Sequence, residues 1–86
     1  MADAALDLLA WPDYREAREA FEAELDTAAA EVEAAHHDFD QARDRYRYAP
    51  HGQAKARLHA MRAANTRVLA AELAYERIRR REPLWG

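Results

Sequence analysis

Two rows of apolar residues, each repeating every seven positions, run through the first half of the chain. They comprise Leu25, Val32, Phe39 and Tyr46 in one row and Tyr14, Phe21, Ala28, Ala35 and Ala42 in the other. Together the rows form an a/d heptad pattern, which predicts a helix that packs along its whole length. No Gly or Pro interrupts residues 13–48, so the pattern predicts one continuous helix over this range.

A short N-terminal segment, residues 1–12, precedes this helix. Pro12 is expected to separate the two, because the residue before a proline is pushed out of the helical region. Asp13 and Glu16 then have the spacing of a capping box, so the long helix is expected to begin at Asp13.

A turn at residues 49–52 follows the long helix. It contains Pro50 and Gly52, and these two residue types are the strongest local breakers of regular structure. A connection this short places successive helices antiparallel, and the second helix is expected to span residues 53–82. The sequence therefore predicts an all-α fold: one domain, residues 1–86, built as a long, coiled-coil-like antiparallel helical hairpin.

The second helix carries two apolar seams rather than one. The first seam consists of Met61, Ala64, Val68, Ala71, Tyr75 and Ile78, and the second of Leu58, Leu69 and Leu73. The seams are displaced by roughly 80–100° around the helix. An apolar arc this wide exceeds what one neighbouring helix covers, so the pattern predicts dimerisation into a four-helix bundle or contact with another protein.

Three polar residues, Asn65, Glu72 and Arg79, repeat every seven positions inside this apolar arc. In a hairpin folded about Pro50 they would face apolar residues of the first helix, which cannot supply hydrogen bonds. We therefore expect their partners to come from another chain. The predicted interface consists of Leu58, Asn65, Leu69, Glu72, Leu73 and Arg79, together with Trp11 and Trp85.

Trp11 and Trp85 are expected to meet at the open end of the hairpin. Residues 83–86 form an apolar tail that follows the second helix, and folding about Pro50 brings this tail level with Trp11. Large aromatic rings gain most from burial. The two tryptophans are therefore expected either to cap the hairpin or to dock a partner protein.

The composition favours oligomerisation as the source of additional stability. Of the 86 residues 22 are Ala, so few large side chains are available for a core. Chains of this size usually need disulfides, a metal or oligomerisation, and this chain has no Cys. No apolar run is long enough for a membrane span and no basic leader precedes an apolar stretch, so we expect a cytoplasmic protein without a membrane partner.

The charge is divided unevenly between the two halves. Residues 1–48 carry a net charge of −8 and residues 49–86 a net charge of +5. Folding about Pro50 would bring Asp38 near Arg62 and Glu33 near Arg67. The charge division therefore predicts attraction between the helices, although each exposed pair contributes only about 0–1 kcal/mol.

Glu33 and His36 have the Glu-x-x-His spacing that resembles the motif of di-iron, ferritin-like four-helix bundles, and Glu72 lies on the second helix as a further weak candidate ligand. The resemblance is incomplete. A second Glu-x-x-His motif is absent, and the register about Pro50 places Glu72 about 12 Å from His36. No metal and no cofactor are therefore predicted.

The most economical interpretation is a non-enzymatic protein-interaction or assembly protein, such as an adaptor, an assembly factor or a structural accessory factor of a phage. The chain contains no Ser and no glycine-rich phosphate loop, so no enzyme is predicted. Two alternatives stay open: a metal-binding ferritin-like protein, and a small nucleic-acid-binding regulator that uses the Arg-rich second helix. Nucleic acid is the less favoured partner, because the net charge of −3 opposes it.

Overall fold

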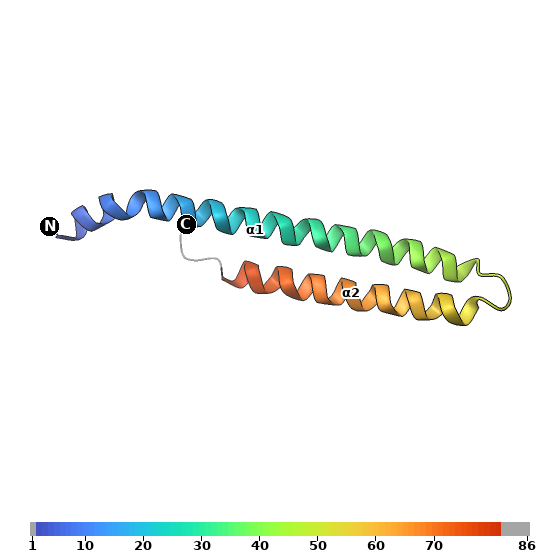
Figure 1. Ribbon diagram of the computed structural model, residues 1–86. Helices are drawn as coiled ribbons and strands as arrows, with labels where there is room; N and C mark the ends of the chain where they lie inside the picture. Colours follow the sequence, from blue (N-terminus) through green and yellow to red (C-terminus); the bar gives the residue numbers. More distant parts are fainter. Residues whose placement is uncertain (1, 82–86) are drawn as a thin grey trace.

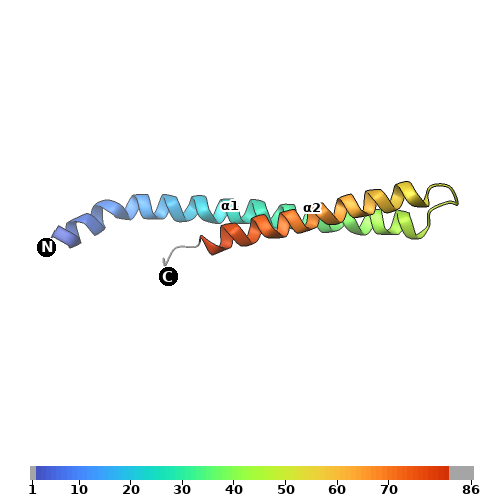
Figure 2. The same cartoon turned by 90° about the horizontal axis from the view of Figure 1, so that it is seen from below.

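The chain folds as an antiparallel helical hairpin. The computed structural model describes residues 2–81, and the side chains of residues 14–81. Two helices, α1 (Ala2–Arg47) and α2 (Ala54–Arg80), lie side by side along the whole of α2 (Figures 1 and 2). Strands are absent from residues 2–81. The predicted all-α hairpin is thereby confirmed.

The hairpin is long and thin, with extents of 76 × 15 × 14 Å. Helix α1 has 46 residues and α2 has 27, so the N-terminal part of α1 projects beyond the end of α2 (Figure 1). Over residues 2–81, neither helix includes a segment with the length and apolarity of a membrane span.

Helix α1 begins at Ala2, which corrects the expectation that Pro12 ends a separate N-terminal segment and that Asp13 caps the long helix. A proline within a helix removes one backbone hydrogen bond and crowds the preceding turn, and a helix often accommodates it by bending. Figure 2 shows such a bend in the blue N-terminal part of α1. The sequence argument treated Pro12 as a boundary, whereas the helix continues through it.

A tight connection closes the hairpin at the other end. The Gln53 backbone N–H donates to the carbonyl of Pro50 at 3.0 Å, and Gly52 between them has φ +109°. This is the sign of φ that a type II turn requires at its third residue, and glycine adopts it without a steric penalty. Arg57 donates from Nη1 to the carbonyl of Arg45 at 3.1 Å, so a cation of α2 satisfies a carbonyl at the C-terminal end of α1.

The predicted α1 rows and the first α2 seam lie in the interface between the helices, except for Tyr46 at the end of its row, which is 37% exposed. The α1 rows from Tyr14 to Ala42 and the first α2 seam from Met61 to Ile78 are all buried or half-buried. The core is thin: Ala35, Val68 and Ala71 form its centre, and Val32 and Phe39 pack against it. No side chain larger than alanine is fully buried among residues 14–81.

The Val68 side chain is the largest one in the core, at 6% exposure. Replacing it with Asp would bury a carboxylate that has no partner, which costs several kcal/mol of unfolding free energy. We expect Val68→Asp to lose most of its helical signal in circular dichroism at 25 °C. Ala70→Asp adds the same charge at an exposed position two residues away and should leave the signal and the melting temperature nearly unchanged. Equal stability of the two variants would contradict the assigned core.

Candidate interaction surface

The two helices meet about one helical turn out of the register expected from folding about Pro50. Ala35 packs with Val68 and Ala71, whereas the simple fold would place it level with residue 65. The Cα–Cβ bonds of a helix tilt toward its N-terminus. In this hairpin the α1 side chains therefore lean away from the turn and the α2 side chains lean toward it. Residues whose backbones are offset by a turn consequently meet.

One flank of the seam is held by a hydrogen bond between the His36 imidazole and the Glu72 carboxylate. The His36 Nε2 lies 2.8 Å from the Glu72 Oε1, which corrects the 12 Å separation expected from the sequence. The one-turn offset described above closes about half of this gap, and the length of the two side chains, which lean toward each other, spans the rest. They remain about half exposed, at 50% and 48%. This flank, which also carries Ala29 and Glu33, is called the His36 flank below.

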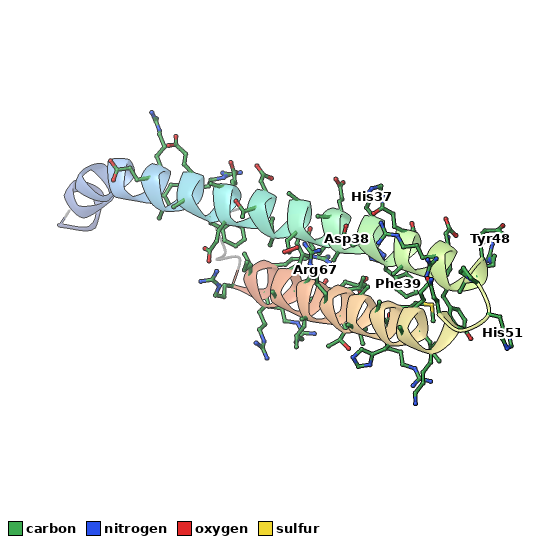
Figure 3. All side chains as sticks on the ribbon, turned by 45° about the vertical axis from the view of Figure 1, so that its right-hand side comes forward. His37, Asp38, Phe39, Tyr48, His51 and Arg67 are labelled. Carbon is green, nitrogen blue, oxygen red and sulfur yellow. The ribbon has the colours of Figure 1, made fainter. Side chains whose placement is uncertain are left out.

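The opposite flank is held by Arg67. Its guanidinium donates to carboxylates of both Glu31 and Asp38, and Figure 3 shows Asp38 and Arg67 pointing toward one another between the helices. The hydrogen bond to Glu31 is the main cause that raises the pKa of Arg67 above its ordinary value, and the charges of both carboxylates add to it. Further toward the open end, Arg81 donates to Glu24 at 2.7 Å.

These contacts confirm charge attraction between the helices but correct the partners. Arg67 pairs with Glu31 and Asp38 rather than with Glu33, and Asp38 pairs with Arg67 rather than with Arg62. The attraction between the helices could be predicted from the opposite net charges of the two halves of the chain. The shift of about one turn accounts for Asp38, whereas Glu31 lies on the other side of the level expected for Arg67 and is reached by the long Arg67 side chain.

The second apolar seam of α2 lies at the surface on the same side as the His36 flank. Leu69 is 59% exposed and Leu73 is 52% exposed, whereas Leu58 is half-buried. At about 100° per residue, Leu69 is rotated away from buried Val68 by a quarter of a turn or slightly more. It therefore points past α1. The two exposed leucines stand one helical turn apart and form the apolar centre of this surface.

Two of the three polar residues of α2 have partners within the chain, contrary to the expectation. Glu72 bonds to His36, and Arg79 lies 3.3 Å from the Glu76 carboxylate one turn earlier. Asn65 is exposed. The argument that Glu72 and Arg79 need a second chain for their hydrogen bonds was wrong. For Glu72 it relied on the unshifted register, and for Arg79 it overlooked Glu76 one turn earlier on the same helix.

The candidate metal ligands do not converge as a set. His36 and Glu72 meet, but Glu33 instead lines a surface hollow of about 230 Å³ with Ala29, Val32 and Tyr75. Within residues 14–81 no three His, Asp or Glu side chains are grouped closely enough to hold a metal. His37 points away from α2 and His51 lies at the turn (Figure 3).

The side chains of Trp11 and Trp85 lie outside the described residues, so their expected contact stays a prediction. Comparison with protein families, curated proteins and solved structures gives no match to this chain.

The hydrogen bond between His36 and Glu72 should contribute little to stability, because both partners are half exposed. We expect a double-mutant cycle of His36→Gln and Glu72→Gln to give a coupling free energy of about 0.2–1 kcal/mol in urea unfolding near neutral pH. The pair Arg43 and Asp40, which lies within α1 at 3.5 Å, is the matched control. A coupling above about 3 kcal/mol would mean that the pair is more deeply desolvated than its half-exposed side chains imply.

Zinc or iron should not stabilise the protein, because two ligands fall short of the three or four that a protein site supplies. We expect the melting temperature to stay unchanged after addition of either ion. A reproducible rise that disappears in His36→Ala would indicate a metal site. The His37→Ala variant, which removes an adjacent imidazole that points away from α2, controls for weak surface binding.

Proposed function

We propose that this chain is a non-enzymatic protein-interaction and assembly protein that works as a self-associating helical hairpin. The observation that carries the proposal is the pair Leu69 and Leu73, more than half exposed and one turn apart on a long helix. Single exposed leucines are common, but two aligned leucines beside a core without large buried side chains favour a further helix as the missing neighbour.

The surface area of the chain supports the same proposal. The hairpin exposes 7045 Å², against roughly 5,200 Å² for a compact monomer of its mass of 9.9 kDa. A second hairpin packed on the leucines would give a four-helix bundle, which is a common way for two helix pairs to bury their apolar stripes. Packing on the leucines would also supply the apolar burial that the thin core lacks.

Adaptors, assembly factors and structural accessory factors all use surfaces of this kind. We propose the cytoplasm as the compartment, because the chain has no Cys and so gives no sign of an oxidising environment. Nucleic-acid binding has weaker support. Of the α2 arginines, Arg57 bonds to the Arg45 carbonyl and Arg67 bonds to two carboxylates, so both are already engaged by α1. A metal-dependent role has weaker support as well, because His36 and Glu72 are the only candidate ligands that meet among the described side chains.

The oligomeric state of the purified protein tests the proposal. We expect light scattering at micromolar concentration to give at least twice the chain mass of 9.9 kDa. The double variant Leu69→Asp with Leu73→Asp should be a folded monomer, because both positions are exposed within one hairpin and a charge there disrupts only an intermolecular contact.

The matched control is Ala70→Asp with Ala74→Asp, which places the same two charges at the same spacing on exposed positions turned away from the leucines. This control should keep the oligomer. A wild-type protein that is a well-folded monomer at these concentrations would overturn self-association.

A further inference from the structure

The exposed side of α2 has a symmetric pattern centred on Leu69. Seven residues share this side, spaced by four, three and four positions before the centre and by four, three and four after it. They are Leu58, Arg62, Asn65, Leu69, Leu73, Glu76 and Arg80. At about 100° per residue all seven fall within an arc of roughly 80°. They are half-buried or exposed within one hairpin, so this seven-residue stripe is available for contact.

The charges of the stripe are complementary under the same symmetry. Arg62 stands seven residues before Leu69, and Glu76 stands seven residues after it. A two-fold axis at the ends of the two Leu69 side chains would therefore set the Arg62 side chain against Glu76 of the partner subunit, twice per dimer, because every side chain is displaced equally toward the N-terminus of its helix. Arg62 and Arg80 have no ion-pair partner among the described side chains, and Glu76 contacts Arg79 at 3.3 Å on the surface, a contact weak enough to be shared.

We propose that the partner covering Leu69 and Leu73 is a second copy of this chain, with the two α2 helices packed antiparallel about a two-fold axis at Leu69. The proposal rests on the self-association proposed above and specifies its geometry. A two-fold interface uses one patch on both subunits and must be complementary to itself. The stripe meets this requirement: Leu69 meets its own copy, Arg62 meets Glu76 of the partner subunit, and Leu73 meets Asn65 of the partner subunit.

The charges also decide between the two directions of packing. In a parallel, in-register pair, Arg62 would face Arg62 of the partner subunit and Glu76 would face Glu76 of the partner subunit. Like charges directly opposite each other are unfavourable, whereas the antiparallel arrangement turns both into attractive pairs. The antiparallel direction is therefore the one that the charges of the stripe favour.

Cysteine cross-linking tests the proposed dimer geometry directly, because the sequence has no Cys and each introduced Cys is therefore the only thiol in its chain. A disulfide needs Cα atoms about 4.4–6.8 Å apart. In the proposed dimer Leu69→Cys should cross-link to itself under mild oxidation. Arg62→Cys should not, since its two copies would be separated by about 14 residues, or roughly 21 Å, along the axis. Glu76→Cys should behave like Arg62→Cys.

An equimolar mixture of Arg62→Cys and Glu76→Cys should give the mixed disulfide as its main product. Intact mass distinguishes the mixed species from each homodimer. Circular dichroism on each reduced variant establishes that it is folded, which is expected because positions 62 and 69 are exposed and position 76 is half-buried. Self-linking of Arg62→Cys, or no self-linking of Leu69→Cys in a chain that light scattering shows to be dimeric, would overturn the two-fold geometry while leaving self-association standing. A monomer would overturn both.

Charge exchange provides a second, independent readout. Arg62→Glu alone and Glu76→Arg alone each convert both interchain pairs to repulsion, and each should weaken dimerisation by roughly tenfold or more at low salt. The double variant restores both pairs and should recover wild-type affinity. A mixture of the two single variants should also recover it, as heterodimers.

The control is Arg15→Glu, which makes the same charge change at an exposed position in the part of α1 that projects beyond the end of α2, and it should leave dimerisation within about twofold of wild type. The differences among the stripe variants should shrink at 1 M salt, where the screening length falls to about 3 Å. If the double variant is as weak as the single ones, the antiparallel pairing of Arg62 with Glu76 is wrong.

Discussion

One seam between two helices carries all of the tertiary structure described here. A hairpin has no third element, so each side chain of α2 either faces α1 or faces outward. The seam is narrow because alanines occupy its centre: Ala35 and Ala71 allow the helices to approach closely but bury little apolar area. The hairpin therefore depends on the close fit of small residues, on the half-buried rings and aliphatic chains beside them, and on polar contacts along both flanks. The same narrowness leaves the second seam of α2 uncovered.

The fold could be predicted from the sequence because its main signals are periodic and local. Residues seven apart fall on one side of a helix whatever their surroundings, so the seams that contain Phe39 and Val68 were predicted correctly. Pro50 and Gly52 located the turn for a similarly local reason. Pro12 shows the limit of local reasoning: a proline both disfavours a helix and can be accommodated within one by a bend, and the residue alone does not decide between these outcomes.

The ion pairs could be predicted in kind but not in detail. Counting backbone levels from the turn placed Glu72 far from His36 and placed Glu33 beside Arg67. Whether two charged side chains meet depends on where their ends lie. In an antiparallel hairpin the Cα–Cβ bonds tilt toward the N-terminus of each helix, and this tilt shifts the side-chain ends relative to each other by about one turn. A calculation that includes this tilt would have reduced the expected separation of His36 and Glu72 to about half, without joining them. The double contact of Arg67 needed the structure, because one guanidinium reaches carboxylates two helical turns apart on α1.

The closed turn at one end and the separate helix ends at the other make the hairpin mechanically anisotropic. A force that pulls the open ends of α1 and α2 apart loads the contacts in sequence, beginning with Glu24 and Arg81 and moving one turn at a time toward Pro50. A force along the long axis that slides one helix past the other loads every contact of the seam at once. The same weak seam therefore resists shear far better than peeling, and a partner bound along the length of α2 would be held in the stronger of these two directions.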